Sequence, residues 1–443
     1  MKKLLFSMQP TNDLGLLAQS LPIAHELRDR GHKVIFCSPA KAPSKVISHN
    51  GFKNFSPGWP IYMILNGDTR FKSFLKMFGS MHLKRDLGIL SWYINHMKEN
   101  ATSEIWNIDH FTYIMGMCNE QYVKAVIETL TKMIVKHKPD AIVNFWNPFM
   151  CIVARINKVP LISVIQADLH PQSKGFIWWK EPPSSLPTPA PLINKILSEY
   201  QMPAIKSMGD LSLGDLTLVL GIREMEPIPD CADITYIGPM LLQNLNEKLP
   251  EWMNNLRKDQ PIIWVYPGNM RYIKGHDSPF DGIVILQTCI EALRDSPIQV
   301  IVSTGHQTLT ENEFNLPSNF RLTTFVPGLA MAERSDLIIH HGGYGSCQTG
   351  LYAGTPSLII PTYSERESNA RRIASIGAGD FILPITDVSG KQKSLDAKEL
   401  RSKIEHLLSE PSYKENAMKI SNSMKKYAGA SGTANLIEKY IQG

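Results

Sequence analysis

Residues 325–379 read FVPGLAMAERSDLIIHHGGYGSCQTGLYAGTPSLIIPTYSERESNARRIASIGAG. Short apolar runs alternate there with turns rich in glycine or polar residues, which is typical of strand, turn and helix in repetition. The pattern predicts strands at 337–339 and 357–360, turns at 340–346 and 361–365, and helices at 347–353 and 367–376. Such units form an α/β domain around a parallel sheet.

The turn at 340–346 carries the clearest chemical signal of the chain, because three glycines and a serine follow a predicted strand. Glycines at such a place let backbone N–H groups and the N-terminus of the next helix approach an anion closely. A diphosphate is the anion that we expect. The stretch therefore predicts a phosphate-binding turn at the end of a parallel strand.

Length and composition limit the number of domains and the kinds of partner that the chain can have. The chain has 443 residues, 43% of them hydrophobic, which is enough for two α/β domains with cores of their own. The net charge of +5 is mild and is spread along the chain, so we expect no nucleic-acid partner. Six scattered cysteines form no CxxC pair, which favours a cytoplasmic protein without a zinc site or a disulfide framework. We expect neither a signal peptide nor a membrane span.

The first half of the chain shows the same α/β alternation. Residues 166–170 follow a predicted strand at its carboxyl end, where open α/β sheets bind their ligands, so Asp168 and His170 are candidates for a cleft. Residues 55–117 are rich in methionine and aromatic side chains, which serve either core packing or a pocket for an apolar or aromatic small molecule. The predicted strands of this half are 4–8, 34–37, 141–145, 161–165, 215–220 and 233–237, and its clearest helices are 20–30 and 148–156.

The second half adds strands that also end in turns. Glycine or polar turns follow the strands at 262–266 and 299–303, and a small-residue break at 428–432 separates the last helix from the others. Thr433 is a possible N-cap of that helix. The other elements predicted here are a strand at 321–325 and helices at 283–293, 396–408, 412–427 and 433–441.

The motifs HGGxGS at 341–346, GxP at 354–356, Pro361 with Glu365, and Asn369-Ala370 resemble the UDP-glycosyltransferase superfamily, as does ELRDRGHKV at 26–34. The resemblance implies an α/β chain with the GT-B fold, two Rossmann-like doubly wound parallel-sheet domains that face a cleft. The implied parts are an acceptor-binding domain at 1–238, a linker at 239–260, a nucleotide-sugar-binding domain at 261–427, and a hinge and C-terminal helix at 428–443 that returns to the first domain.

The function that the resemblance implies is inverting transfer of a sugar from a UDP- or TDP-sugar to a hydroxyl of a small, largely apolar or aromatic acceptor, as in natural product glycosylation. The nucleotide-sugar is then a co-substrate, no cofactor or metal is expected, and the protein is a monomer or homodimer. Two alternatives stay open. One is a GT-B enzyme that acts on a lipid-linked acceptor or epimerises the nucleotide-sugar, and the other is a non-catalytic helper that binds it.

The resemblance also assigns donor-site residues. His341, Gly343, Gly345 and Ser346 would contact the donor diphosphate, whereas His340 should point to the other side of the strand. Glu365 would bind sugar hydroxyls, or else serve as a charge in the first turn of a helix.

Two residues depart from the family pattern on the donor side. Thr349 stands where the family commonly has a glutamate that binds the ribose, and a hydroxyl would bind it more weakly. Arg366 stands where the family commonly has a glutamine beside the sugar. Its cation would meet a carboxylated sugar, a phosphate or Glu365, or simply face solvent.

The base pocket and the catalytic base are harder to assign. Similar proteins hold the base against backbone groups at the position of residues 325–328, which include Phe325 and Val326. The turns containing Gly268, Asn269 and Thr304 would line the same pocket, and no stacking aromatic is identified. The family's usual base is a histidine after a glycine in the first helix, but here leucine follows Gly15. Asp13 is the nearest proton acceptor, although it also suits a turn or a helix cap. Asp168 and His170 on the acceptor side are reserve candidates.

Overall fold

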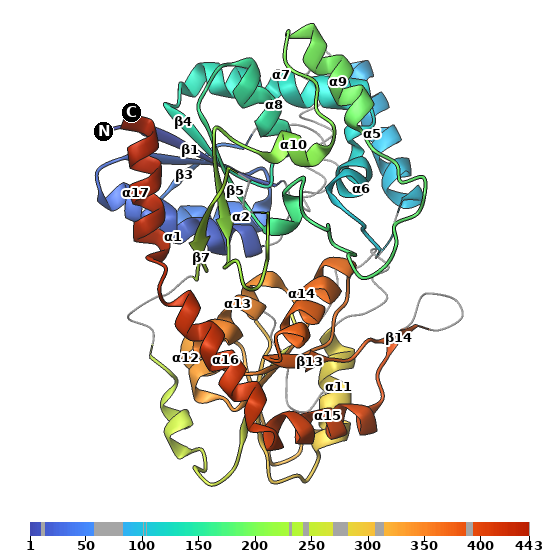
Figure 1. Ribbon diagram of the computed structural model, residues 1–443, viewed down its shortest axis with the longest axis vertical. Helices are drawn as coiled ribbons and strands as arrows, with labels where there is room; N and C mark the ends of the chain where they lie inside the picture. Colours follow the sequence, from blue (N-terminus) through green and yellow to red (C-terminus); the bar gives the residue numbers. More distant parts are fainter. Residues whose placement is uncertain are drawn as a thin grey trace. The chain divides into compact units, whose positions relative to one another are not determined.

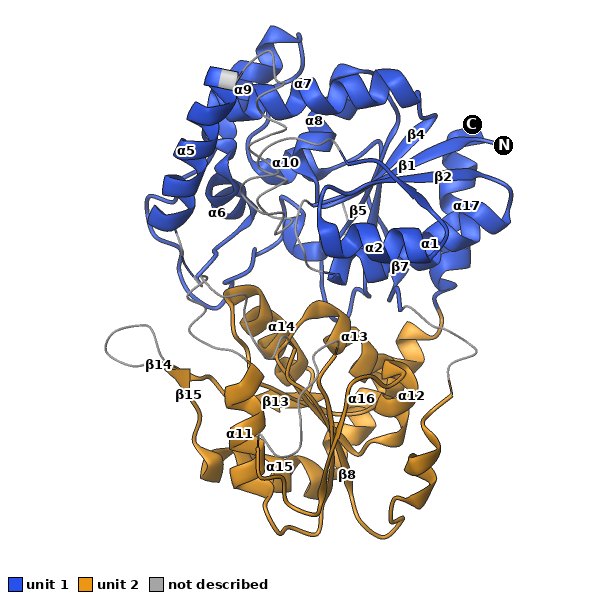
Figure 2. Cartoon of the chain, turned by 180° about the vertical axis from the view of Figure 1, so that it is seen from behind, with its two compact units in different colours: residues 1–242, 427–443 blue, residues 243–426 orange. Residues whose placement is uncertain are grey.

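The computed structural model describes residues 1–9, 14–56, 83–100, 102, 104–229, 233–241, 248–268, 282–305, 314–386 and 393–442 of the 443-residue chain. The chain divides into two compact units (Figure 2). Unit 1 comprises Met1–Leu242 and Tyr427–Gly443, and unit 2 comprises Gln243–Lys426. None of the helices that the structure describes is long and apolar enough to cross a lipid bilayer.

In its described part, unit 1 is built on a seven-stranded parallel sheet (Figure 1) in the order β3-β2-β1-β4-β5-β6-β7. The strand order runs outward in both directions from β1 and β4, so the two neighbours mark the point where the winding reverses. The strands are β1 (Lys3–Met8), β2 (Lys33–Cys37), β3 (Lys53–Asn54), β4 (Ala141–Phe145), β5 (Leu161–Ile165), β6 (Leu216–Leu220) and β7 (Thr235–Gly238).

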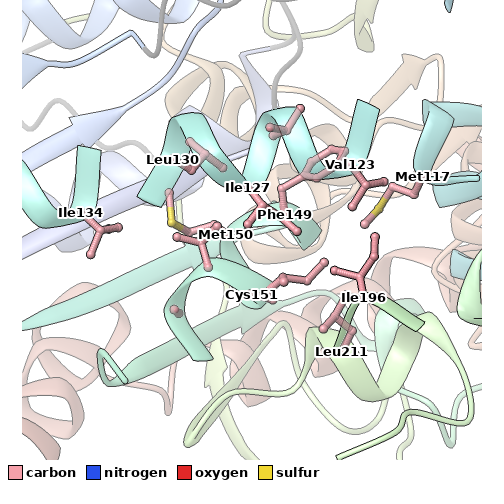
Figure 3. Close-up of a cluster of buried hydrophobic side chains, with 14 of the residues drawn as sticks. Met117, Val123, Ile127, Leu130, Ile134, Phe149, Met150, Cys151, Ile196 and Leu211 are labelled. Carbon is pink, nitrogen blue, oxygen red and sulfur yellow. The ribbon is translucent and has the colours of Figure 1, made fainter. Parts of the chain in front are cut away.

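The helices of unit 1 bury apolar stripes against this sheet. In α7 the side chains of Val123, Ile127 and Leu130 recur at helical spacing and are buried against Phe149 of α8, as Figure 3 shows. Each such fully buried side chain contributes about 1.5–3 kcal/mol. The described helices are α1 (Gly15–Asp29), α2 (Lys41–His49), α5 (Leu83–Glu99), α6 (Ile108–Thr112), η1 (Tyr113–Met117), α7 (Glu120–His137), α8 (Pro148–Ile156), η2 (Ala167–Leu169), α9 (Ala190–Glu199), α10 (Met208–Ser212) and α17 (Gly429–Gln442).

Unit 2 repeats the same winding in six parallel strands, in the order β10-β9-β8-β11-β12-β13 over its described residues. Here the reversal lies between β8 and β11. The strands are β8 (Ile262–Tyr266), β9 (Gln299–Ser303), β10 (Phe320–Thr323), β11 (Leu337–His340), β12 (Ser357–Ile359) and β13 (Gly379–Phe381), with an antiparallel pair β14 (Ile385–Thr386) and β15 (Lys393–Ser394).

One face of the second sheet packs under α11 and α15, and the other packs under α12 and η3. Alternation along the strands produces this division, because Ile339 of β11 belongs to the first layer and Ile338 to the second. The helices are η3 (Glu251–Asn255), α11 (Gly282–Leu293), α12 (Gly328–Arg334), α13 (Tyr344–Ala353), α14 (Ser364–Ser375), α15 (Ala397–Ser409) and α16 (Pro411–Met424).

Four predicted helix starts were wrong, each by three to five residues. The helices expected from residues 20, 347, 367 and 433 begin at residues 15, 344, 364 and 429. The first three have no side-chain cap, so the usual start signal is missing. Thr433 is not a cap, because its hydroxyl donates to the Gly429 carbonyl one turn earlier, at 2.8 Å.

The last helix, α17, packs against α1 within unit 1 and is held there by Glu438. The Arg30 guanidinium lies 2.7 Å from Glu438 Oε2, and His32 Nε2 lies 2.8 Å from Oε1. The Lys2 backbone N–H donates to His32 Nδ1, so a neutral His32 carries its proton on Nε2 and donates it to Glu438. The bonds from His32 and Arg30 hold the pKa of the Glu438 carboxyl below its usual value.

We expect Glu438→Gln to lower the free energy of unfolding of unit 1 by about 1 kcal/mol at neutral pH. A carboxyl whose pKa is depressed on folding stabilises the fold above its unfolded pKa, and this contribution is lost as the pH falls through the folded pKa. The difference between variant and wild type should therefore shrink below about pH 4. Urea denaturation followed by circular dichroism at several pH values measures it.

Glu104→Gln is the matched control, since Glu104 pairs with Lys180 on the exposed surface of the same unit. It should change the free energy of unfolding by less than about 0.5 kcal/mol. Equal losses in the two variants would contradict a specific role for Glu438.

Candidate functional site

Three of the predicted donor-site residues lie at one edge of the second sheet. His341 directly follows β11, Gly268 follows β8 after one residue, and Thr304 directly follows β9. These three strands are parallel neighbours, so their carboxyl ends lie together. Sheets with this strand order bind ligands outside the carboxyl ends of the strands, where the winding reverses. His341 and Gly268 flank that point.

The imidazole of His341 is packed between two glycines. A Cβ atom on Gly268 would come within 2.2 Å of His341 Cδ2, and one on Gly343 would come within 2.5 Å of Cε1. Gly268 also has a φ of +81°, a conformation that other residues adopt at a cost. Any side chain at either position would therefore displace the ring.

His341 is neutral and presents a hydrogen-bond donor. The Gly343 backbone N–H donates to its Nδ1 at 3.0 Å, which leaves the proton of a neutral imidazole on Nε2. Burial lowers the pKa of His341 well below its usual value, and the nearby cation of Arg366 lowers it further. The pKa fixes the charge state, and the backbone bond fixes the tautomer.

His340 lies on the opposite side of the strand, as alternation predicts, and is fully buried. The Gly342 N–H donates to its Nδ1 at 3.1 Å, and burial lowers its pKa to about 3. Its Nε2 has no hydrogen-bond partner among the residues that the structure describes. His340 thus helps to hold the glycine turn in place from the buried side of the strand.

Gly345 and Ser346 occupy the first turn of α13, whereas we expected them in the turn before the helix. The first bond within the helix runs from the Cys347 N–H to the Gly343 carbonyl at 3.1 Å. The N–H groups of Gly345 and Ser346 therefore have no acceptor within the helix, and they point from its positive end. Together with His341 Nε2–H, they form a set of donors suited to an anion.

The turn is anchored by α14. Asn369 Nδ2 donates to the Gly342 carbonyl at 3.0 Å and to Glu365 Oε1 at 2.9 Å. Gly342 has a φ of +85°, and a Cβ atom there would come within 2.9 Å of the Arg366 carbonyl oxygen. Asn369 therefore holds the turn and one carboxylate oxygen of Glu365 at the same time.

Glu365 and Arg366 lie in the first turn of α14 and not in the turn before it. In the described part of the chain, the Arg366 side chain contacts the Thr362 hydroxyl through Nη1 and the Tyr363 ring, whose centre lies 4.9 Å from the guanidinium carbon. Because its charge also acts on His341, Arg366 adds positive potential beside the α13 N-terminus.

The other residues that were predicted to contact the nucleoside belong to unit 2 as well. The Thr349 hydroxyl donates to the Gly345 carbonyl at 2.8 Å, so toward a ligand it offers only an acceptor. Val326 is buried under α12, and the Thr304 N–H donates to the Thr323 carbonyl. Asn269 lies outside the described residues.

Phe325 belongs to the stretch that was expected to hold the base, but no stacking role was assigned to it from the sequence. It directly precedes Val326 and is 55% exposed, which is unusual for a side chain of its size. The signal was available in the sequence, since an aromatic residue precedes a buried valine in the turn that leads into α12. Its flat face is suited to stacking on a base.

In unit 1, Asp168 and His170 lie just past the carboxyl end of β5, and both are buried. The Gln172 N–H donates to His170 Nδ1 at 3.2 Å, and burial lowers the pKa of His170. Asp13 lies outside the described residues. Gln9, the last described residue before it, donates its N–H to the Phe145 carbonyl at the end of β4.

A search of the described residues finds no group of three or more His, Cys, Asp or Glu side chains that could hold a metal ion. The donor set above consists of N–H groups and one nearby cation, which suits an anionic ligand.

Comparisons with known proteins show which proteins the chain resembles. Residues 288–433 match a family model described as the erythromycin biosynthesis protein CIII-like C-terminal domain. The uncharacterized UDP-glucosyltransferase YojK of Bacillus subtilis is 27% identical over 234 residues, covering 52% of this chain and 53% of its own length. A PGL/p-HBAD biosynthesis glycosyltransferase of Mycobacterium tuberculosis is 24% identical over 327 residues, covering 69% of this chain and 71% of its own length. The chain thus spans about half the length of YojK.

Among solved structures, the calicheamicin glycosyltransferase CalG4 superposes with a TM-score of 0.70 at 17% identity, covering 100% of this chain and 98% of its own. The glycosyltransferase VinC in complex with DTDP gives a TM-score of 0.63 at 17% identity, covering 99% of both chains. The two α/β units therefore have the GT-B fold. With the HGGxGS turn and the matches in sequence, this fold makes the chain similar to members of the UDP-glycosyltransferase superfamily.

Proposed function

We propose that the chain is an inverting glycosyltransferase that moves a sugar from a nucleoside diphosphate sugar to a hydroxyl of a small, largely apolar or aromatic acceptor. The observation that carries the proposal is the donor set at the reversal point of the second sheet: His341 Nε2–H and the N–H groups that begin α13. Relatives named as UDP-glucosyltransferase and NDP-glycosyltransferase, and a structural neighbour with bound DTDP, support a nucleotide donor.

The donor diphosphate would bind at the α13 N-terminus. Gly345 and Ser346 donate backbone N–H groups, and neutral His341 donates from Nε2 without the cost of burying a second charge. Arg366 adds the cation that partly balances the diphosphate. As the bond to the sugar breaks, negative charge develops on the leaving phosphate, so fixed donors there lower the barrier most.

The base would stack on Phe325, and the sugar would lie near Glu365, whose carboxylate accepts hydrogen bonds from hydroxyl groups. Asn369 orients that carboxylate from the opposite side. Thr349 would accept a bond from the ribose through its hydroxyl oxygen.

Direct displacement at the anomeric carbon needs a base that takes the proton of the acceptor hydroxyl. We assign this role to Asp13, and such a base accelerates the step by about 10²–10⁴-fold. The acceptor would bind at the carboxyl ends of β4 and β5, beside Asp168 and His170. Structural neighbours named as a spinosyn forosaminyltransferase and a calicheamicin glycosyltransferase support an acceptor of the natural-product type.

The decisive experiment incubates the protein with a panel of UDP- and TDP-sugars and of phenolic or polyketide acceptors, and detects a sugar adduct by mass. Release of UDP that depends on the acceptor supports transfer. Conversion of the nucleotide-sugar without an acceptor would indicate an epimerase instead. Binding without turnover across the panel would indicate a helper protein.

Gly343→Ala should weaken UDP binding by about 10-fold or more, because the new methyl group displaces the His341 ring and a hydrogen bond to a charged group is lost. The backbone of Gly343, with φ of −60°, accommodates alanine, so the fold should persist. Isothermal titration calorimetry with UDP measures the effect. Gly88→Ala on α5, where a Cβ atom meets nothing within 4 Å, is the control and should bind UDP as the wild type does.

Asp13→Asn should reduce transfer by at least about 100-fold while UDP affinity stays within about 2-fold of the wild type, because only proton transfer is lost. Single-turnover rates and calorimetry separate the two quantities. Transfer at the wild-type rate would rule out Asp13 as the base and turn attention to His170 or Asp168.

Arg366→Gln should weaken UDP-glucose and UDP-glucuronate binding by the same factor, about 5-fold, because we assign the cation to the diphosphate and not to the sugar. Competition against a fluorescent UDP analogue measures both affinities. A loss confined to UDP-glucuronate would instead place a sugar carboxylate beside Arg366.

A further inference from the structure

A small pocket lies in unit 1 at the carboxyl ends of the neighbouring strands β4 and β5. It has a volume of about 10 Å³, room for about one group the size of water or hydroxyl. Apolar side chains of α6, β5, η2 and α8 line it, together with the polar side chains of Asn144 and Trp146 and those of Thr112, Asn147 and Ser212. Such a place, at the carboxyl ends of the central strands, is where sheets of this kind bind ligands.

Asn144 and Trp146 each have a buried polar atom without a hydrogen-bond partner among the residues that the structure describes. Asn144 is 3% exposed, and its Nδ2 donates to the Asn147 carbonyl at 3.2 Å and to Cys151 Sγ at 3.1 Å. Its Oδ1 is buried without a partner, and so is the Trp146 Nε1–H, among the residues that the structure describes. Buried polar atoms are paired in nearly all native proteins, so a free acceptor and a free donor in one pocket indicate a bound group.

The backbone of Trp146 is held in an unusual conformation that orients its indole ring. Its φ of +59° lies in the left-handed region, which bulky residues seldom adopt, and it connects β4 to Asn147, the N-cap of α8. The ring packs edge-on against Phe111, with centroids 5.8 Å apart, and lies 6.0 Å from Phe176. Strain of this kind persists where the surrounding structure fixes a functional geometry.

We propose that this pocket binds a hydroxyl group of the acceptor other than the one that is glycosylated. That hydroxyl donates to Asn144 Oδ1 and accepts from Trp146 Nε1–H, which pairs both atoms with a single group. The site therefore selects apolar or aromatic acceptors with at least two hydroxyls. The identity of the ligand as an acceptor rests on the proposed function.

The position of the pocket agrees with this assignment. The Gln9 N–H donates to the carbonyl of Phe145, the residue before Trp146, at 3.0 Å. The described end of the first strand segment, at Gln9, therefore lies beside the end of β4, and Trp146, which follows β4, lines the pocket.

The test compares a naphthol and the matching methylnaphthalene, in which a methyl group replaces the hydroxyl, by calorimetry in the absence of nucleotide-sugar. We expect the full chain to bind the naphthol about 5-fold more tightly, the effect of one neutral hydroxyl that is paired on both sides. Trp146→Phe keeps an aromatic ring but removes the N–H, and should reduce this preference to less than about 2-fold. Trp92→Phe, on α5 and outside the pocket, is the control and should keep the preference.

A second measurement does not depend on a variant's folding. The indole N–H resonance of Trp146 in the wild-type protein should shift downfield when the naphthol is added, because the N–H gains an acceptor, and should not do so with the methylnaphthalene. The proposal would be overturned by equal affinities for the two probes, by a preference that survives Trp146→Phe, or by an unmoved resonance. Equal affinities would identify the pocket as a water site. Failure of the proposed function looks different, because then no donor gives transfer while the preference for the naphthol remains.

Discussion

The proposed donor site depends on the close packing of one imidazole ring against two glycines, which leave room for the ring because they have no side chain. The His341 imidazole occupies the space next to Gly268 and Gly343, which come from the ends of two neighbouring strands. The ring is thereby fixed in place and in protonation, since one of the glycines also donates its N–H to Nδ1. A neutral donor group that is already held in place loses little conformational entropy when an anion binds. Preorganisation of this kind makes the donor effective at stabilising negative charge.

The supports around that ring come from three further segments. Asn369 ties the turn to α14, His340 pairs with the Gly342 N–H from the buried side, and α13 begins at the turn itself. Each of these contacts satisfies a backbone group that would otherwise be unpaired near the end of a strand. The same bonds that stabilise the turn therefore shape the site, so its geometry is a property of the fold of unit 2 alone.

Much of the fold could be predicted from the sequence, and the predictions that were wrong or missing have physical causes. The bounds of β4, β5, β8, β9 and α8 match the predictions because buried parallel strands read as short apolar runs between breakers. Helix starts were wrong where no side chain caps the helix. The pocket at Asn144 and Trp146 depends on contacts between segments far apart in the chain, which local patterns do not encode. A stacking role for Phe325 was not assigned, because its exposure follows from packing and not from its neighbours in sequence.

The last helix gives the chain a particular order of assembly. Unit 1 contains residues from both ends of the sequence, since α17 packs on α1 and Tyr427 lies against Gly238, where even one methyl group would come within 2.4 Å. During synthesis, unit 2 is complete before unit 1 can be. Unit 2 can thus fold as a continuous segment, whereas unit 1 cannot be completed, and leaves the surface of α1 exposed, until the residues of α17 are made.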